Sequence, residues 1–299
     1  MRVTLPMKYD RIVNDLSRKN TQLEDLAAQI SSGKRILRPS DDPLSWVKAM
    51  NIKKGLQELD ALQSNVDYAI HWNRAAENTL DHLSELFVSA KEVAIAAMGA
   101  PSGEGDFARM EQLDQIFQQA LALANTSHEN RFLFAVNSSH PPFVFQAEEQ
   151  ELVLDPELGD SFSVRIGYGL FQEQGLNGGS LFIAQEEGDA LSAFQMLLDL
   201  KEAVSERDTA EITRQMENIE KVLENLWRQT SVVGNRLTTL DAQKEALERI
   251  SLEEQVRLSK VEDTDMLATI SQLQAKSTTF EAALKVTGML QGLNLTQYI

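Results

Sequence analysis

Residues 5–43, LPMKYDRIVNDLSRKNTQLEDLAAQISSGKRILRPSDDP, decide the fold of this chain. Their apolar side chains recur at alternating intervals of four and three residues, a spacing that places them along one side of an α-helix. Only Lys19 interrupts this stripe, whose members are Leu5, Tyr9, Ile12, Leu16, Leu23, Leu26 and Ile30. The helix is expected to end at Ser31-Ser32-Gly33, because glycine suits the left-handed conformation that terminates helices.

A second, much longer helix is predicted to begin at Asp41-Asp42-Pro43. Proline at a first helical position loses only an N–H that has no intrahelical partner, and the residue before it is pushed into the extended geometry of a cap. The helix is predicted to run to Met98, which makes it about 84 Å long at about 1.5 Å per residue. Pro101 and Gly103 then interrupt it. Its apolar stripe comprises Leu62, Val66, Ala69, Asn73, Ala76, Leu80, Leu83, Phe87, Ala90, Ala94 and Ala97.

The C-terminal third repeats the same spacing in two helices, which Glu262-Asp263-Thr264-Asp265 separates. The first stripe comprises Ile212, Met216, Ile219, Leu223, Leu226, Thr230, Val233, Leu237, Leu240, Lys244 and Leu247. The second comprises Met266, Ile270, Leu273, Ser277, Phe280, Leu284 and Thr287.

Residues 132–200 differ in composition. They hold seven of the 15 glycines, and Arg165 is their single base among eleven acids, so they carry −10 of the net charge of −17. Short β-rich runs, bounded by turn residues, predict strands around Phe143–Phe145, Leu152–Leu154, Phe162–Ile166 and Leu181–Ile183. A shorter helix is expected before this segment, at about Phe107–Glu129.

These patterns predict a mainly α fold with a small β-rich insert, in which the N- and C-terminal regions form a long antiparallel, coiled-coil-like helical rod. The expected parts are an N-terminal helix at 1–40, a rod at 41–131 and 201–262, an acidic insert at 132–200 and a C-terminal helix at 263–299. Because one apolar stripe cannot bury itself, the two end helices must pair with each other or with other copies.

Composition excludes several classes of function. Acids outnumber bases 45 to 28, which argues against binding the phosphates of nucleic acid or an anionic membrane surface. The absence of cysteine excludes disulfides and thiolate chemistry. The residues after Met1 lack the apolar core of a cleaved secretory signal, and no run of 18 apolar residues follows, so membrane insertion is not expected.

No arrangement of side chains supports catalysis, a metal or a cofactor. His71, His82, His128 and His140 lack the spacing of metal ligands. The adjacent carboxylates of Asp41 and Asp42 diverge in direction and fit a helix start better than an acid–base pair. Gly167-Tyr168-Gly169 has no third glycine in register and is typical of a turn. The chain is therefore not expected to be an enzyme.

Several motifs together resemble the flagellin family of bacterial flagellar proteins. Gln29-Ile30-Ser31-Ser32-Gly33-Lys34-Arg35-Ile36 followed by Asp41-Asp42-Pro43 is similar to the family's N-terminal region, and Asn130-Arg131-Phe132-Leu133-Phe134 to a segment of its hook–filament junction members. The C-terminal half adds Arg236, Glu262-Asp263-Thr264-Asp265 and the ending Leu293–Ile299. The positions that carry the resemblance are Ser31, Ser32, Gly33, Arg35, Ile36, Asp41, Asp42, Pro43, Asn130, Arg131, Phe132, Arg236, Glu262, Asp263 and Asp265.

The resemblance implies a structural subunit of the extracellular flagellum, exported without signal cleavage, with its end helices inside a tube of subunits and its insert outside. Pro43-Leu44 and the Tyr-Ile ending favour the members that join hook to filament over flagellin itself. The partners implied are other copies of the chain, hook-associated protein 1, flagellin and an export chaperone. A cytoplasmic coiled-coil adaptor is a further alternative, and it predicts stable dimers and no secretion.

The expected assembly interface consists of apolar positions on the two end helices. We expect residues 1–40 and 265–299 to be mobile in the free subunit and to become ordered on assembly. The interface positions are Ile12, Leu16, Leu23, Leu26, Ile30, Ile270, Leu273, Phe280 and Leu284. The family precedent places a chaperone on the C-terminal helix, where the candidate contacts are Leu273, Phe280 and Leu284.

Overall fold

The computed structural model describes residues 5–99, 105–146, 151–154, 161–186 and 189–295. The chain divides into two compact units. Residues Met1–Leu59 and Ile250–Ile299 form one, called here the terminal unit, and Asp60–Arg249 form the other, called the central unit. The expected break at Pro101 and Gly103 and the last four residues of the chain lie outside the described residues.

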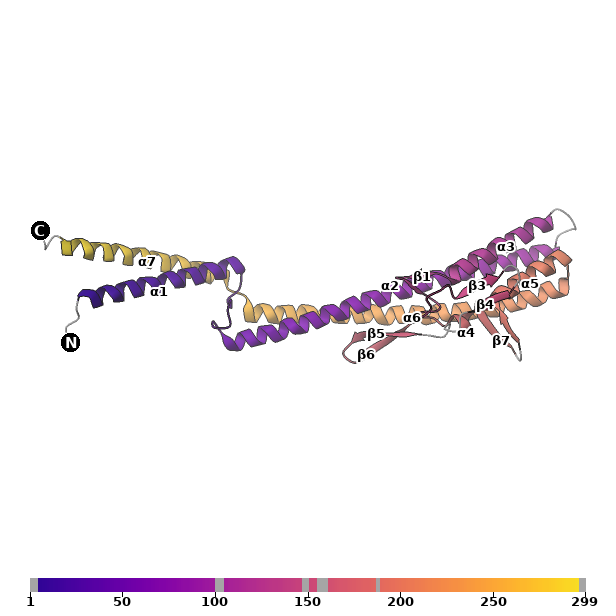
Figure 1. Ribbon diagram of the computed structural model, residues 1–299, viewed down its shortest axis with the longest axis horizontal. Helices are drawn as coiled ribbons and strands as arrows, with labels where there is room; N and C mark the ends of the chain where they lie inside the picture. The colour runs from indigo at the N-terminus through magenta and orange to yellow at the C-terminus, as the bar shows by residue number, and fades with distance from the viewer. Residues whose placement is uncertain (1–4, 100–104, 147–150, 155–160, 187–188, 296–299) are drawn as a thin grey trace. The chain divides into compact units, whose positions relative to one another are not determined.

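The terminal unit is helical. It contains α1 (Leu5–Ser32), the start of α2 (Pro43–Gly99), the end of α6 (Thr209–Glu262) and α7 (Met266–Leu295). The helices α1 and α7 lie side by side and run antiparallel (Figure 1). The N-terminal helix ends where the sequence predicted, and Gly33 adopts the expected left-handed conformation, with φ of 72°.

The central unit is built on α2 and α6, which run antiparallel. An ion pair of 2.7 Å joins Lys244 Nζ to Asp67 Oδ1, and another joins Lys91 to Glu220 further along both helices. Residue numbers rise on α2 as they fall on α6, as an antiparallel pair requires. The predicted stripes face inward, and the fully buried members include Leu80, Leu83, Phe87, Ala90, Ile219, Leu226 and Leu240.

Two shorter helices and four β-hairpins complete the central unit. The helices α3 (Gly105–Ala124) and α5 (Ala193–Glu206) pack against each other. Each hairpin is an antiparallel two-stranded sheet. The pairs are β1 (Ser127–His128) with β2 (Arg131–Phe132), β3 (Phe143–Gln146) with β4 (Glu151–Leu154), β5 (Phe162–Gly167) with β6 (Leu170–Gln174), and β7 (Ile183–Glu186) with β8 (Asp189–Ser192).

Two local expectations were wrong. Leu181 and Phe182 belong to the short helix α4 (Gly178–Phe182) rather than to a strand, because the Asn177 side chain accepts a hydrogen bond from Ser180 N at 3.0 Å and caps a helical turn. The helix α3 ends at Ala124 rather than near Glu129. Asn125 ends it by exchanging two hydrogen bonds with the backbone of Phe143, of 2.7 and 3.0 Å, which ties the start of β3 to the helix.

Phenylalanines from four segments form the core beneath the hairpins. Phe182 packs against Phe134, Phe143 and Phe194 with ring centroids 5.0–5.3 Å apart. All four side chains are at most 1% exposed. Gly178 lies so close that a Cβ there would be 2.8 Å from the carbonyl oxygen of Phe134. The helix α4 therefore serves to place Phe182 in this core.

The predicted fold class is confirmed. The chain is mainly helical, with antiparallel pairs of long helices and a small set of strands between them. Among the described residues, no helix combines the length and the hydropathy needed to cross a lipid bilayer.

Replacing Phe182 by alanine should destabilise the central unit by about 3–5 kcal/mol, the usual effect of removing a fully buried ring. Urea unfolding followed by far-UV circular dichroism measures the change. The matched control is Phe107→Ala, because Phe107 is 72% exposed and should change stability by no more than about 0.5 kcal/mol. Equal effects of the two substitutions would contradict this view of the core.

Candidate assembly surface

The two units differ sharply in how well they bury apolar side chains. Of the 46 buried apolar residues among those described, only four belong to the terminal unit: Leu26, Ile36, Ala49 and Leu59. The same unit holds 14 of the 24 exposed large apolar residues. Scattered exposed apolar side chains are ordinary on a protein surface. When a unit has little core of its own and many such side chains, another surface is needed to cover them.

The pair of α1 and α7 contains every residue predicted for the assembly interface. Ile12 and Leu16 face the α7 segment around Ala283, and Leu23 lies opposite Ile270 and Leu273. Lys276 Nζ donates a hydrogen bond of 3.0 Å to Gln22 Oε1 across the pair. The structure thus brings the predicted stripes of the two end helices together within one chain.

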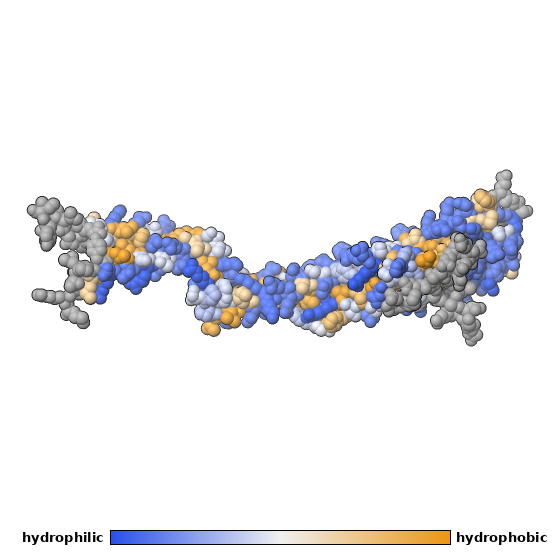
Figure 2. Space-filling model, viewed as in Figure 1, coloured by the Kyte–Doolittle hydropathy of each residue, from blue (hydrophilic) through white to orange (hydrophobic). Residues whose placement is uncertain are grey.

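Pairing leaves much of this interface open to solvent. Leu26 is buried, whereas Ile12, Leu16, Leu23, Ile30, Leu273 and Phe280 are only half-buried. Ile270 and Leu284 remain exposed. Apolar side chains gather in patches over this pair of helices (Figure 2). One neighbouring helix is therefore not enough to cover the predicted interface.

The two helices also differ in charge. Eight of the 28 residues of α1 are charged, but in the 30 residues of α7 only Lys276, Glu281 and Lys285 are. Apolar residues lie on several sides of α7, and Leu267 and Met289 are 81% and 68% exposed. A helix that is apolar on more than one side is usually buried on more than one side. The helix α7 therefore offers further surface for partners.

A joint of extended chain holds α1 and α7 in place. Arg35 N donates to Glu262 O at 2.7 Å, and Thr264 N donates to Gly33 O at 2.9 Å. These two hydrogen bonds form an antiparallel bridge between Lys34 and Asp263. The end of α1 is thus tied to the start of α7 by backbone hydrogen bonds, with Ile36 buried beside them.

Glu262 is the charged centre of this joint. The residue is 4% exposed. Its carboxylate oxygens lie 2.8 Å from Lys34 Nζ and 2.7 Å from Lys53 Nζ. Burial alone would raise the pKa of Glu262, but the hydrogen bonds and charges of the two lysines outweigh it and hold that pKa below its ordinary value. The hydrogen bond to Glu262 in turn raises the pKa of Lys34. The ion cluster therefore joins the end of α6 to α2 and to the segment that follows α1.

The aspartates of the joint act as caps. Asp42 Oδ1 accepts a hydrogen bond from Ser45 N at 3.1 Å at the start of α2, and Asp265 Oδ1 accepts one from Ala268 N at 3.1 Å at the start of α7. Asp41 Oδ2 accepts from the backbone N–H groups of Leu37 and Arg38 and shapes the preceding loop. The interpretation of Asp41-Asp42 as a helix start is confirmed.

Arg35 contacts helices other than the one that it follows. It follows α1, yet its Nη2 donates at 3.0 Å to the carbonyl oxygen of Val261, at the C-terminal end of α6. Its Nη1 lies 3.5 Å from Asp42 Oδ2. The Arg35 side chain therefore stabilises the carbonyl end of another helix and links it to the cap of α2.

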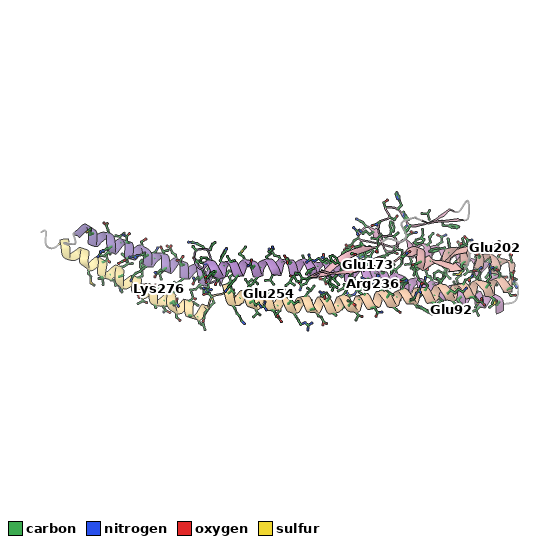
Figure 3. The ribbon with its side chains drawn as sticks, turned by 90° about the horizontal axis from the view of Figure 1, so that it is seen from below. Glu92, Glu173, Glu202, Arg236, Glu254 and Lys276 are labelled. Atoms are coloured by element: carbon green, nitrogen blue, oxygen red, sulfur yellow. The ribbon has the colours of Figure 1, made fainter. Side chains whose placement is uncertain are left out.

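The remaining motif residues lie in the central unit. Asn130, with φ of 64°, forms the turn between β1 and β2, and the Arg131 guanidinium lies 5.1 Å from the centre of the Phe162 ring. Arg236 on α6 donates to Gly175 O at 3.2 Å and lies beside Glu173 (Figure 3). Burial lowers the pKa of Arg236, and Glu173 opposes that shift. Arg131 thus links two hairpins, and Arg236 links α6 to the segment after β6, so these residues do not lie in the joint.

Sequence reasoning missed the part that Lys53 plays in this site. Lys53 lies on α2, 209 positions before Glu262, and no local pattern relates the two residues. Its partner could have been anticipated only once α2 and α6 were known to run antiparallel in register.

The chain is similar in sequence to known flagellar proteins. Residues 7–139 match the bacterial flagellin N-terminal helical region. The chain is 22% identical to flagellar hook-associated protein 3 of Escherichia coli, over 99% of both chains. The chain is thus similar to flagellin in its N-terminal region and to flagellar hook-associated protein 3 over its full length.

Solved structures agree on the fold. FlgL of Bacillus cereus matches with a TM-score of 0.59 at 20% identity, covering 70% of this chain and 98% of that one. The flagellar junction protein FlgL of Legionella pneumophila matches with a TM-score of 0.58 at 13% identity, covering 71% of this chain and 100% of that one. The full-length similarity to hook-associated protein 3 agrees with the expectation of a flagellar structural protein of the hook-associated type.

The Glu262 cluster predicts how the stability of the terminal unit depends on pH. Because the folded-state pKa of Glu262 lies below the ordinary value of 4.5, its contribution is complete at pH 7 and is lost as the pH falls below 4.5 and through the folded-state pKa. The difference in unfolding free energy between the native chain and Glu262→Gln should therefore be largest near neutral pH and shrink in acid.

Urea unfolding followed by the fluorescence of Trp46, in a Trp72→Phe and Trp227→Phe background, measures this difference in the terminal unit. Glu254→Gln is the control, because the ion pair of Glu254 is formed with Arg257 on its own helix. A stability difference for Glu262→Gln that stays constant from pH 7 into acid would show that the charge of Glu262 is not involved.

Proposed function

We propose that this chain is the subunit that joins the hook to the filament, and that α1 and α7 are its assembly helices. The observation that carries the proposal is the exposed apolar surface of α7, a helix with three charged residues among 30. Such a helix is stable in water only when neighbours cover it, and neighbouring subunits of a tube supply that cover.

The energetics of the two helices support assembly as the ordering event. Full burial of a large aliphatic side chain contributes about 1.5–3 kcal/mol, whereas fixing the backbone of one residue costs about 1–2 kcal/mol. On these figures, a helix that buries only one residue in four on a single partner gains less from burial than it costs to order its backbone. Covering Ile270, Leu284 and the other exposed residues of α7 would shift that balance toward order.

The joint gives this surface a fixed anchor. Backbone hydrogen bonds and the Glu262 cluster hold the inner ends of α1 and α7 together. The outer ends have no such tie among the described residues. We infer that the helices pack first near the joint and that contact with neighbours orders the rest.

The proposed partners follow from position in such a tube. A junction subunit meets other copies of itself at its sides, hook-associated protein 1 on the hook side and flagellin on the filament side. Before export, a chaperone would cover Leu273, Phe280 and Leu284, which follow one another along α7 at intervals of seven and four residues. Binding of the chaperone that survives deletion of residues 265–299 would refute this assignment.

The parts proposed for these roles keep the boundaries given by the sequence. Residues 1–40 and 263–299 are the assembly helices, 41–131 and 201–262 form the rod, and 132–200 form the outer insert. The net charge of −10 on the insert makes its outer surface well solvated and repels like surfaces.

In the free subunit, amide hydrogens of α1 and α7 should exchange much faster than those of the central unit, because few apolar side chains are buried around them. Hydrogen exchange with mass spectrometry on dilute monomer measures this directly. Residues 262–275, next to the joint, should be better protected than residues 280–290. Protection of both helices equal to that of the buried residues of α2 would contradict the proposal.

Leu284→Glu should block assembly while leaving the monomer folded. Leu284 is 47% exposed, so the stability of the monomer should change by no more than about 0.5 kcal/mol, whereas a buried carboxylate between subunits is strongly unfavourable. A motile host carrying this variant should make hooks without filaments and shed flagellin into the medium. Gln272→Glu is the control, because Gln272 is exposed and polar already.

Two results would count against the junction role. Normal filaments on cells that carry Leu284→Glu would show that this face of α7 is not used. Long filaments formed by the purified native chain, seen by electron microscopy, would favour unlimited polymerisation, as flagellin does, over a subunit that needs two different neighbours.

A further inference from the structure

The hairpin of β5 and β6 presents a basic aromatic cluster to solvent. Side chains alternate between the two faces of a strand, and Arg165 stands directly opposite Phe171 in the strand register. Arg165 and Phe171 both point away from the helices. In the turn, the centre of the Tyr168 ring lies 6.0 Å from the Arg165 guanidinium carbon. Phe171 and Tyr168 are each 61% exposed. We call Arg165, Tyr168 and Phe171 the hairpin cluster.

The helices hold this hairpin in a fixed position. Asn65 on α2 donates a hydrogen bond of 2.9 Å to Arg165 O, and Gln243 on α6 donates one of 3.0 Å to Ile166 O. The opposite face of the hairpin, including buried Ile166, packs inward. The hairpin cluster is therefore a rigid feature with exposed aromatic rings, and nothing in the described part of the chain covers it.

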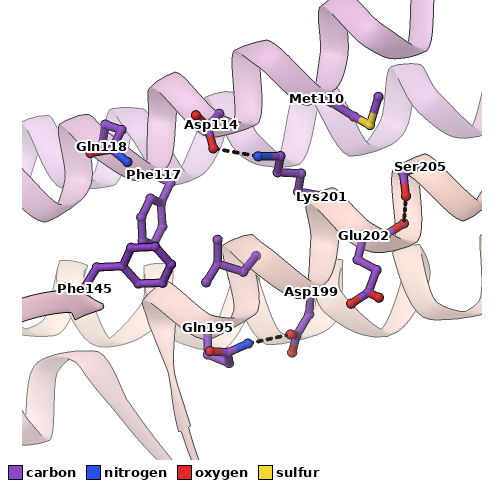
Figure 4. Close-up of a pocket in the computed structure, with 11 residues that line it drawn as sticks. Met110, Asp114, Phe117, Gln118, Phe145, Gln195, Asp199, Lys201, Glu202 and Ser205 are labelled. Carbon is purple, nitrogen blue, oxygen red and sulfur yellow. Dashed lines mark hydrogen bonds and ion pairs between the residues drawn. The ribbon is translucent and has the colours of Figure 1, made fainter. Parts of the chain in front are cut away.

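A groove of complementary character lies between α3 and α5, in the same unit. Phe117 and Phe145 form an aromatic wall, with ring centroids 5.0 Å apart (Figure 4). Asp114, Asp199 and Glu202 lie around it, and its volume is about 420 Å³, which is within the usual range for a small-ligand site.

The charges of the groove do not balance. Lys201 Nζ pairs with Asp114 Oδ1 at 2.7 Å, and Asp199 accepts a hydrogen bond from the neutral Gln195. Asp199 and Glu202 thus leave the groove with two net negative charges beside an aromatic wall. A guanidinium flanked by aromatic rings matches this environment in both charge and polarity.

We propose that the α3–α5 groove of one copy receives the hairpin cluster of a second copy. The two surfaces lie at separate places along the central unit and cannot meet within one molecule (Figure 1). A contact between two different surfaces of identical chains is heterologous, so it links copies in a row or a ring. It lies outside the end helices and adds a contact between subunits that the proposed assembly through α1 and α7 does not require.

Charge composition supports a second copy as the occupant. Arg165 is the single base in residues 132–200, and it lies on the exposed face of a hairpin between two exposed rings. The remainder of that segment is acidic and would be repelled by the groove. Glu173 lies on the same face, opposite Ser163 in the strand register, and Arg236 on α6 offsets its charge. The hairpin cluster is thus the surface of residues 132–200 whose charge complements that of the groove.

Cysteine cross-linking tests the contact, since the chain has no cysteine of its own. Ser163 lies on the exposed face of β5, two residues from Arg165, and Ser205 lines the groove. Full-length Ser163→Cys and Ser205→Cys chains, mixed at high concentration under mild oxidation, should form a disulfide-linked heterodimer. A mixture of Ser163→Cys with Ser231→Cys, on the exposed side of α6, is the matched control and should give at least about tenfold less.

Charge reversal separates a specific contact from chance collision. Introducing Arg165→Glu into the Ser163→Cys chain should lower the heterodimer yield at least about tenfold, because like charges then face each other. Introducing Glu202→Arg into the Ser205→Cys chain should restore part of the yield. The native contact should also weaken as salt is raised, since both surfaces are exposed.

The heterodimer yield decides between a specific contact and none. A yield no greater than that of the Ser231→Cys control, or one that Arg165→Glu leaves unchanged, overturns the proposal. Cross-linking of Ser205→Cys to a different flagellar protein, and not to the Ser163→Cys chain, overturns it as well. Adding Leu284→Glu to both chains should leave the yield unchanged, so failure of this contact is distinct from failure of assembly through α7.

Discussion

The short antiparallel bridge between Gly33–Arg35 and Glu262–Thr264 is the constraint on which the terminal unit depends. Two backbone hydrogen bonds bring together segments more than 220 residues apart in the chain. They fix the inner ends of α1 and α7 side by side, and the Glu262 carboxylate between Lys34 and Lys53 adds charge to the same place. Without this joint, two helices with little buried surface would have no defined register.

The proposed assembly surface is separate from the core that keeps the chain folded. The central unit buries its own apolar stripes and its phenylalanine core, so it resembles an ordinary folded domain. The terminal unit leaves comparable side chains in water. A protein that must travel as a single chain and then form part of a larger structure benefits from this division, because the surface used for assembly is not needed to keep the subunit folded.

Much of the fold could be predicted because long helices leave a strong periodic signal. The stripes around Leu80 and Leu226, the break at Gly33 and the helix start at Asp42 follow from spacing and local chemistry, and each lies where it was expected. The predictions failed where tertiary contacts outweighed local preference. Leu181 and Phe182 have the composition of a strand, but a turn capped by Asn177 delivers Phe182 into an aromatic core that no short sequence window reveals.

The sequence alone determined that both ends of the chain are amphipathic or apolar helices and that the middle is acidic and rich in turns. It also carried the motifs of the flagellin family. Only the tertiary structure decided that Lys53 shares Glu262 with Lys34, that Arg35 serves the end of α6, and which face of α7 stays uncovered. The physical reason is that periodicity reports which side of a helix is apolar, whereas register and partner choice arise from contacts between residues hundreds of positions apart.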